Sequence, residues 1–565
     1  MLLKARRHPN TSRYGTIRQH GRVARGMVVS TMAAVLAVGS AGAFASESAE
    51  AGGTNKTWSN QVRDYATESL NDEQALSLAA IPMNGPGIEQ YINADALMSP
   101  GSIMKLVTTY AALEILGPTH HWDTSFYTDG ELVGDTLNGN FYVDMGGDPK
   151  LTIERLWSTL NELRGMGISA INGNLVLDGD VFRIADEQPV FDDNGDNPHA
   201  PFLVKPSPYL SNLNLIHFQV RADERGTQAW SAPSLNDVVI DNRVIATAEA
   251  PCPARRHFTW EPFFHEDHRV TVRVSGELPQ GCRTTAYLSL LPHEQYTASM
   301  IRSLLSDMGI DINGKSLLAL CEDHGVLSVY NVDLNGKVSE VVTGKSLLAK
   351  TPDDARLLLR TTSPDLVTMV RDINKWSSNV MARQLLLTIG AENRLEDEED
   401  DRVAGIRVVN EWLQEKGVNT AGLVIENGAG LTRDGRITAR QGAQILQHAW
   451  NSPFASDLMA SMPLIAMDGT MARRLRNSGL DGKGRIKTGY LENVRSIAGF
   501  TRDDTDTTWA IVGMVNNDPA WNGQAVLDRI IYSLHYRPPT GTTLSRAQSS
   551  GTKIESVSGG SYTGD

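Results

Sequence analysis

Apolar residues recur at helical spacing in four segments, one before residue 120 and three after residue 360. After Pro100 and Gly101, for example, Ile103, Leu106 and Tyr110 follow one another at intervals of three and four. A period of this kind predicts helices that bury one face. The four segments are 106–116, 366–390, 405–417 and 438–450.

The middle of the chain has a different pattern. Short runs rich in β-branched residues alternate with Gly, Asn and Asp, and this predicts strands joined by turns. The runs are 139–152, 171–182, 215–223, 237–250, 268–278 and 325–342. After them, 495–517 predicts a hairpin with an acidic turn. A mostly β insertion therefore interrupts a mostly helical part, and the predicted fold class is α/β (α+β).

The first 45 residues have the three parts of a secretory signal. A basic region precedes an uncharged run that starts at Met27, and Ala43-Phe44-Ala45 has the small-residue pattern of a cleavage site. We expect a signal peptide, 1–45, that is cleaved near Ala45, and a periplasmic protein; an uncleaved anchor is the alternative. No later segment is apolar over the length that a membrane span needs, so no permanent span is expected.

Both ends of the remaining chain are small and polar. Residues 46–60 predict a flexible leader. Residues 541–565 are rich in Ser, Thr and Gly and predict a disordered tail, because they carry almost no large apolar side chains that could pack.

Composition narrows the class of protein. With 565 residues, of which 41% are hydrophobic and 21% charged, the chain is expected to form two or three folded units. Its formal net charge of −14 argues against nucleic acid as a partner, because phosphate contacts need clustered Lys and Arg.

Three cysteines, Cys252, Cys282 and Cys321, are present. Export into an oxidising compartment makes a disulfide plausible. Cys252–Cys282 is the preferred pair because the segment between them is strand-rich, although the sequence alone leaves the pairing open.

The first candidate chemistry lies in "SPGSIMKLVT", residues 99–108. Ser102 and Lys105 are three residues apart where a helix is predicted to begin, so their side chains can meet over one turn. A serine at this place is also a common helix cap. Burial and the positive end of the helix dipole both favour a neutral Lys105, which could then act as the base toward Ser102.

Two later stretches could complete a site around Ser102. "SSN", with Ser377 and Asn379, falls at a predicted turn between helices, and "KTG", Lys487 to Gly489, falls on a predicted strand. For Ser377 a local turn or cap is the alternative role. The order S-x-x-K, S-x-N, K-T-G is that of penicillin-binding proteins and serine β-lactamases.

With these motifs, the chain resembles the low-molecular-weight class C penicillin-binding proteins, the D-alanyl-D-alanine carboxypeptidase and endopeptidase family. The interval of about 275 residues between Ser102 and Ser377 fits, since this family carries two extra domains there. Further stretches of resemblance are "MGGDPKLT", "INGNLVLDGDVF", "NGAGLTRDGRITARQGAQIL" and "DGTMARRL".

The resemblance implies a β-lactamase/transpeptidase-like domain with two mainly β domains inserted between the S-x-x-K and S-x-N motifs. The catalytic domain would comprise 60–125 and 345–540. Inserted domain II would comprise 126–190 and 286–344, and inserted domain III would comprise 191–285.

The resemblance also implies roles for the motif residues. Ser102 would be the nucleophile, Ser377 would relay a proton to the departing D-alanine amine, and Asn379 would hold the substrate amide. Lys487 and Thr488 would bind the terminal carboxylate, because a point charge beside a hydroxyl suits a free C-terminus.

The backbone N–H groups of Ser102 and Tyr490 would form the oxyanion hole, with Gly489 between the carboxylate clamp and Tyr490. Tyr490 stands where relatives often have threonine, which affects fine specificity. Asp178 and Phe182 would contact the side-chain amine of a diaminopimelate residue; a strand-end turn with a core Phe is their alternative.

Two other stretches are less specific. Arg433, in "GAGLTR", could support the active site or lie on a surface loop. His265 and His268, in "HEDH", lack the i, i+4 spacing of a zinc motif, so we expect surface histidines and neither metal nor cofactor.

The sequence thus predicts an exported serine-type D-Ala-D-Ala carboxypeptidase (EC 3.4.16.4) and DD-endopeptidase that acts on peptidoglycan peptides through an acyl-enzyme on Ser102. β-Lactam antibiotics would be covalent inhibitors. A serine β-lactamase and a catalytically vestigial wall-binding protein are the alternatives. The oligomeric state stays open, with a dimer among the options.

Overall fold

The computed structural model describes most of the chain from Thr57 to Tyr536. The described residues are 57–185, 191, 198–254, 257–266, 269–313, 316–322, 326–332, 338–343, 350–518, 520, 522–536 and 539. Between 316 and 343 only the backbone is described. The predicted signal peptide, 1–45, and the predicted disordered tail, 541–565, lie outside these residues.

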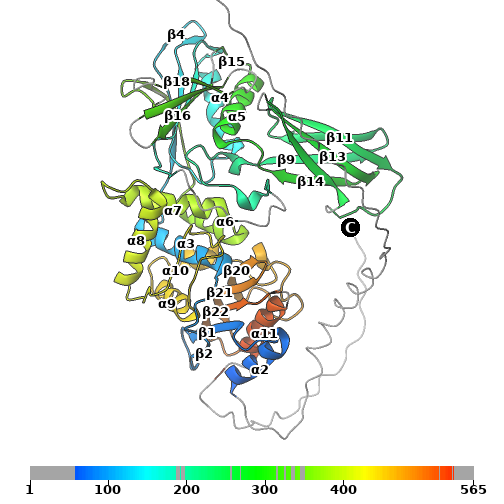
Figure 1. Cartoon of the computed structure of the whole chain (residues 1–565), viewed down its shortest axis with the longest axis vertical. Helices are drawn as coiled ribbons and strands as arrows, with labels where there is room; N and C mark the ends of the chain where they lie inside the picture. Colours follow the sequence, from blue (N-terminus) through cyan, green and yellow to red (C-terminus); the bar gives the residue numbers. More distant parts are fainter. Residues whose placement is uncertain are drawn as a thin grey trace, which may run out of the picture. The chain divides into compact units, whose positions relative to one another are not determined.

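A five-stranded antiparallel sheet forms the centre of the part built from the two ends of the chain (Figure 1). Its order is β2-β1-β22-β21-β20. The predicted hairpin 495–517 is confirmed as its two strands β21 and β22. The strands are β1 (Leu76–Pro82), β2 (Gln90–Ile92), β20 (Gly484–Leu491), β21 (Val494–Arg502) and β22 (Thr508–Asn516).

Helices cover both faces of this central sheet, because successive strand residues such as Leu78 and Ala79 point into two separate apolar clusters. α2 (Trp58–Leu70) and α11 (Gly523–Tyr536) pack on one face. The cluster on the other face is built with α3 (Met104–Ile115), α6 (Leu366–Trp376), α7 (Asn379–Asn393), α8 (Asp401–Glu415), α9 (Ala439–Trp450) and α10 (Ala455–Ser461). Each of the four predicted helical segments is confirmed, with 366–390 divided into α6 and α7.

The predicted flexible leader is wrong for its last residues. α2 begins at Trp58, and the Thr57 hydroxyl accepts a hydrogen bond from the Asn60 backbone N–H at 3.4 Å. Trp58 is buried against the central sheet. A capped helix with a buried indole orders this segment. Among the described residues, no helix is both long enough and apolar enough to cross a bilayer.

The first part of the insertion is a seven-stranded sheet of order β18-β17-β16-β8-β6-β3-β19. Two helices, α4 (Ile153–Gly165) and α5 (His293–Asp307), pack in its core, and the strand-rich pattern did not indicate them. A small sheet, β15-β7-β5-β4, adjoins it. The strands of the large sheet are β3 (Asp123–Thr128), β6 (Phe141–Met145), β8 (Leu175–Asp178), β16 (Ser316–Glu322), β17 (Val326–Val332), β18 (Val338–Thr343) and β19 (Arg356–Thr362). Those of the small sheet are β4 (Glu131–Val133), β5 (Thr136–Asn138), β7 (Ala170–Ile171) and β15 (Asp311–Ile312).

The strands β3 and β19 of this large sheet indicate where the insertion begins and ends. β3 begins at Asp123 and pairs antiparallel with β19, which ends at Thr362. Both strands hydrogen-bond within the sheet of the insertion, so we propose that the insertion runs from about residue 122 to about residue 363. The sequence-based bounds of 125 and 345 would cut through this sheet.

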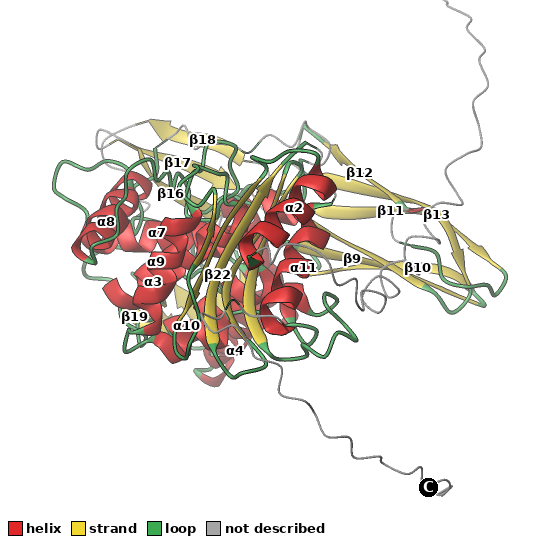
Figure 2. Cartoon of the chain, turned by 90° about the horizontal axis from the view of Figure 1, so that it is seen from below, coloured by secondary structure: helices red, strands yellow, loops and turns green. Residues whose placement is uncertain are grey.

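The second part of the insertion is a sandwich of two three-stranded sheets (Figure 2). One sheet has the order β10-β9-β14 and the other β11-β13-β12. Val220, Val244 and Val274 meet between them in one apolar cluster. The strands are β9 (Ile216–Asp223), β10 (Gly226–Ala232), β11 (Val238–Thr247), β12 (Thr259–Phe264), β13 (Val270–Pro279) and β14 (Arg283–Leu288).

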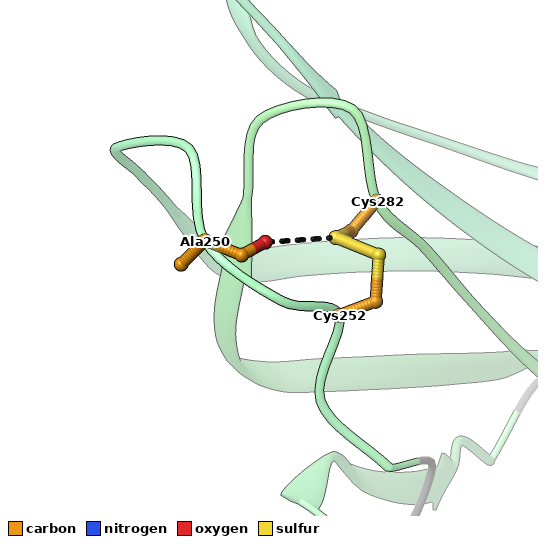
Figure 3. The surroundings of a disulfide bond; sticks show 3 residues. All are labelled: Ala250, Cys252 and Cys282. Atoms are coloured by element: carbon orange, nitrogen blue, oxygen red, sulfur yellow. Dashed lines mark hydrogen bonds between the residues drawn. A yellow bond between two sulfur atoms is a disulfide. The ribbon is translucent and has the colours of Figure 1, made fainter.

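A disulfide joins Cys252 to Cys282 in this sandwich (Figure 3), which confirms the preferred pairing. Their Cα atoms are 5.5 Å apart, and Cys282 is buried in the sandwich core. The third cysteine, Cys321, lies on β16, where the side chains are outside the described residues.

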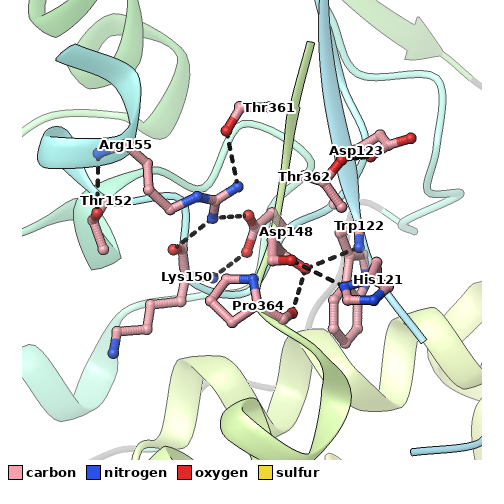
Figure 4. A network of polar contacts seen from close by, with 12 residues as sticks. His121, Trp122, Asp123, Asp148, Lys150, Thr152, Arg155, Thr361, Thr362 and Pro364 are labelled. Atoms are coloured by element: carbon pink, nitrogen blue, oxygen red, sulfur yellow. Dashed lines mark hydrogen bonds and ion pairs between the residues drawn. The ribbon is translucent and has the colours of Figure 1, made fainter. Parts of the chain in front are cut away.

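A polar network surrounds the buried Asp148 in the insertion (Figure 4), and residues next to Asp148 contact α6 and α7. Asp148 accepts hydrogen bonds from the Arg155 guanidinium at 2.5 Å and from the Lys150 backbone N–H at 2.7 Å. The Lys150 side chain pairs with Asp372 on α6. On α7, the Gln384 amide donates to the carbonyl of Gly147 at 3.1 Å. These bonds join the insertion to both α6 and α7.

Candidate active site

Ser102 lies in a tight turn that leads into α3. Pro100 ends the preceding segment, and Gly101 has a φ of +52°, a value that favours glycine. Gly101–Ile103 then form a 3-10 turn, η1, and α3 starts at Met104. Ser102 therefore lies in a 3-10 turn directly before the α-helix, and Lys105 is the second residue of α3. Neither η1 nor α3 is capped by a side-chain hydrogen bond, so the helix-cap alternative for Ser102 is not what the structure contains.

Lys105 is fully buried, and three oxygen atoms surround its amine. Nζ is 2.8 Å from Ser102 Oγ, 2.6 Å from Asn379 Oδ1 and 2.7 Å from the Ala429 carbonyl oxygen. Burial lowers the pKa of Lys105 well below its usual value, and the charges of Lys487 and Arg383 lower it further. Burial and the neighbouring charges therefore both favour the neutral form of the amine.

The two carbonyl oxygens decide how a neutral Lys105 is oriented. They can only accept hydrogen bonds, so they take the two N–H groups of the amine. The nitrogen lone pair is then left for the third neighbour, the Ser102 hydroxyl. This is the arrangement that a general base needs.

Ser377 and Asn379 come from the junction of α6 and α7. Ser377 ends α6 in the left-handed conformation, with a φ of +59°, and Asn379 begins α7. The turn directs Ser377 Oγ to Lys487 Nζ, at 2.8 Å. Asn379 accepts from Lys105, as above, and its amide nitrogen donates to the Phe202 carbonyl at 2.9 Å.

Lys487, Thr488 and Gly489 lie on β20 at the edge of the central sheet. Lys487 is fully buried, and burial lowers its pKa to about 7. Its ammonium donates to the Thr488 carbonyl at 2.7 Å as well as to Ser377. The Thr488 hydroxyl is 2.8 Å from that of Thr470, a residue of η5 (Gly469–Met471).

Gly489 lets β20 approach the turn that carries Ser102. A Cβ atom at Gly489 would lie 2.9 Å from the Ser102 backbone nitrogen and 2.8 Å from the Pro100 carbonyl oxygen. On the other side of the same contact, a Cβ at Gly101 would be 3.5 Å from the Tyr490 backbone nitrogen. The backbone N–H groups of Ser102 and Tyr490 therefore belong to two segments in close contact.

The Tyr490 side chain projects from this contact and is 68% exposed. The Arg495 guanidinium stacks on its ring, 3.7 Å from the centroid. Arg495 is itself buried, and it donates to the carbonyls of Leu491 and Val494 at 2.5 Å and 2.8 Å. Tyr490 is two residues from Thr488 on β20, so the two side chains leave the same face of the strand.

The motif residues named from the sequence form one constellation, and three further residues to which the sequence assigned no role join it. The carbonyls of Ala429 and Phe202 and the hydroxyl of Thr470 contact Lys105, Asn379 and Thr488 respectively. Ala429 and Thr470 lie in "GAGLTR" and "DGTMARRL", so the resemblance pointed to their segments. Backbone contacts such as that of Phe202 carry no side-chain signal.

Asp178 and Phe182 are not joined to this constellation by any contact among the described residues. Asp178 is buried and accepts hydrogen bonds from the backbone N–H groups of Asp180 and Thr351 at 3.2 Å and 2.7 Å. Phe182 is buried and packs over Gly147. These contacts are those of a strand-end turn with a core Phe, and a diaminopimelate contact stays a prediction.

The remaining candidates are Arg433 and the two histidines of "HEDH". Arg433 is exposed and its guanidinium is 5.5 Å from the centre of the Phe191 ring. His265 Nε2 is 2.8 Å from the Thr271 hydroxyl, and His268 is outside the described residues. Within the described part of the chain, no three His, Cys, Asp or Glu side chains are grouped to hold a metal ion.

In this site a serine lies beside a buried lysine, next to an S-x-N turn and a K-T-G edge strand, on a sheet covered by helices. This combination defines a serine peptidase of the penicillin-binding class with a transpeptidase-like fold. The sequence model of the D-Ala-D-Ala carboxypeptidase 3 (S13) family matches residues 69–327 and 334–533. The chain belongs to this family.

Individual relatives agree with this assignment. A D-alanyl-D-alanine carboxypeptidase from an Actinomadura species is 26% identical over 494 residues, which cover 84% of each chain. Another from Haemophilus influenzae is 24% identical over 472 residues, 81% of this chain and 89% of that one. The crystal structure of penicillin-binding protein 4 from Haemophilus influenzae superposes with a TM-score of 0.65 at 22% identity, covering 85% of this chain and 98% of the other.

Proposed function

We propose that the chain is a serine-type D-Ala-D-Ala carboxypeptidase that works through an acyl-enzyme on Ser102. The observation that carries the proposal is the surrounding of Lys105 Nζ, which is 2.6 Å and 2.7 Å from two carbonyl oxygens and 2.8 Å from Ser102 Oγ. In a neutral amine the carbonyl oxygens take the two N–H groups, so the lone pair is left for Ser102. A serine hydroxyl becomes an effective nucleophile only when such a base removes its proton.

In the acylation step, Lys105 takes the proton of Ser102 while Oγ attacks the carbonyl carbon of the penultimate D-alanine. The N–H groups of Ser102 and Tyr490 donate to the oxygen that becomes negative. The C–N bond then breaks, and the departing amine receives a proton that Lys105 passes on through Ser377. Water later attacks the ester, releases the peptide and restores the Ser102 hydroxyl.

The terminal carboxylate of the substrate would lie against Lys487 and Thr488. Lys487 supplies a positive charge when protonated, and the Thr488 hydroxyl supplies a hydrogen bond. Asn379, held by Lys105 and by the Phe202 carbonyl, would bind the peptide amide. The exposed Tyr490 ring would border the same place and influence which peptide is accepted.

We further propose that the enzyme acts on peptidoglycan peptides in the periplasm, that it also cleaves D-alanyl-diaminopimelate crosslinks as a DD-endopeptidase, and that β-lactams acylate Ser102. A relative, penicillin-binding protein 4 from Haemophilus influenzae, has been crystallised in complex with a β-lactam, which supports the last point.

The test is to incubate the mature chain with a pentapeptide muropeptide and, separately, with a crosslinked dimer. We expect release of D-alanine from the first and conversion of the second to monomers. A lasting penicillin adduct, rather than steady turnover of nitrocefin, separates the proposed peptidase from a β-lactamase. Failure to cut either substrate would favour the vestigial wall-binding protein.

The buried Lys487 predicts a pH dependence. With a pKa of about 7, Lys487 is charged below pH 7 and neutral above it. The attraction for an anionic C-terminus is therefore lost as pH rises, and we expect kcat/KM for a peptide with a free carboxylate to fall by up to about tenfold per pH unit above 7. A peptide with a C-terminal amide is the control, since it has no charge to lose; equal pH profiles for the two peptides would contradict the clamp.

A further inference from the structure

The outer face of the β10-β9-β14 sheet carries three rows of side chains that span all three strands, and these rows form an exposed platform. Alternate strand residues point away from the sandwich core, and the antiparallel register sets them side by side. Rows two residues apart are about 6.5 Å from each other, so three rows extend over about 13 Å. The rows are Ala232–His217–Tyr287, Trp230–Gln219–Thr285 and Gln228–Arg221–Arg283.

The first two rows present aromatic rings. Tyr287 is 45% exposed and stacks on His217, with ring centroids 4.2 Å apart and planes only 6° from parallel. Trp230, in the next row, is 36% exposed. Gln219 lies between the aromatic positions and adds an amide group. Flat rings beside amides suit the apolar faces and hydroxyl groups of sugar rings.

The third row places two like charges together. Arg221 and Arg283 are directly opposite each other on β9 and β14, and both are exposed. Like charges at such positions destabilise a sheet. Among the described residues, neither guanidinium has a carboxylate within ion-pair distance, although the chain carries a formal net charge of −14. This pair is complementary to an anionic ligand.

The segment 198–215 links the aromatic end of the platform to the active site. β9 starts at Ile216 and β14 ends at Leu288, beside the segment 198–215. Within that segment, Asn214 donates to Ser289 Oγ at 3.0 Å, and the Phe202 carbonyl accepts from Asn379 of the active site. The row with Tyr287 is therefore the end of the platform nearest to this segment.

We propose that the face formed by His217, Gln219, Arg221, Trp230, Arg283 and Tyr287, here named the β9 platform, binds the sugar strand of peptidoglycan, with the two arginines on carboxylates of the attached peptides. This proposal rests on the proposed function, because it assumes that the substrate peptide is attached to such a strand. A polymer held on the platform would present its peptides to Ser102 repeatedly, which raises their effective concentration there.

The test is co-sedimentation of the full chain with insoluble peptidoglycan at about 0.15 M ionic strength, where weak surface electrostatics are screened. A Ser102→Ala background prevents cleavage during the measurement. We expect Trp230→Ala with Tyr287→Ala, and separately Arg221→Gln with Arg283→Gln, to weaken binding at least tenfold. Matched controls are Trp157→Ala, an exposed tryptophan of α4, and Arg243→Gln, an exposed arginine of the other sheet; both should bind as the parent does.

Two further measurements distinguish a failure of the platform proposal from a failure of the proposed function. With Ser102 restored, the platform variants should release D-alanine from a soluble pentapeptide at the parent rate. Peptide-free sugar strands should compete with insoluble peptidoglycan for the parent chain. Undiminished binding of both platform variants would overturn the proposal, and a protein partner would then be the better occupant. Competition by free peptides but not by sugar strands would also overturn it, because the peptides would then account for the binding. Platform-dependent binding by a chain that cuts no peptide would overturn the function alone.

Discussion

Lys105→Ala is expected to lower kcat/KM for D-Ala-D-Ala peptides by at least about 10³-fold and to abolish covalent labelling by penicillin. Without the amine, nothing accepts the Ser102 proton, because the other groups around Nζ are carbonyl oxygens that cannot act as a base. The adduct is measured by mass spectrometry of the intact chain after incubation with excess penicillin. Full labelling of the variant would refute the base role.

The fold of this variant must be checked separately. Removal of the amine leaves the oxygens of Asn379 and Ala429 without their buried donor, which costs about 1–3 kcal/mol of stability. Lys105→Met fills more of the space and should be equally inactive. Lys483→Ala, which removes an exposed lysine just before β20, is the matched control and should label fully. An unfolded Lys105→Ala together with an active Lys105→Met would also refute the role.

Gly489→Ala is expected to reduce the rate of acylation by about 10²- to 10³-fold. The added methyl would lie 2.1 Å from Ser496 Oγ and within 3 Å of two backbone atoms, Pro100 O and Ser102 N. Backbone atoms cannot rotate away, so β20 has to move from the Ser102 turn. The N–H groups of Ser102 and Tyr490 would then separate, and they could no longer share the oxyanion.

Gly484→Ala is the control on the same strand. Its methyl would meet the end of the flexible Ile465 side chain at 2.5 Å, and that side chain can adjust. We expect acylation within about threefold of the parent and a similar melting temperature, since adjustment of one apolar side chain is cheap. Acylation of Gly489→Ala at the rate of Gly484→Ala would show that the close approach of β20 to Ser102 is not needed.

Much of the fold could be predicted because its signals are local. The apolar spacing of α3, α7 and α9 and the turn residues around β21 and β22 are properties of neighbours along the chain. The helices α4 and α5 were not indicated, since they stand among strand-like runs that dominated the pattern. The predicted flexible leader extended to residue 60 and so included Trp58. The composition of this segment is small and polar, and it did not show that the Trp58 indole is buried and that the ordered part begins there.

The motif residues could be named from the sequence because their order and spacing are features of the sequence itself. The residues that contact them could not be named in the same way. Phe202 contacts Asn379 with a backbone carbonyl, which any residue possesses. Arg221 and Arg283 are 62 residues apart in the sequence, and only the register of β9 and β14 places them opposite each other.

The sequence by itself determined the apolar period of α3, α7 and α9 and the order of Ser102-x-x-Lys105, Ser377-x-Asn379 and Lys487-Thr488-Gly489. Only the tertiary structure decided the chemistry of these groups. The lowered pKa values of Lys105 and Lys487 come from burial by segments far away in the chain, and the fit of Gly489 comes from a close contact with the Ser102 turn. Periodicity depends on neighbours in sequence, but burial and approach depend on neighbours in space.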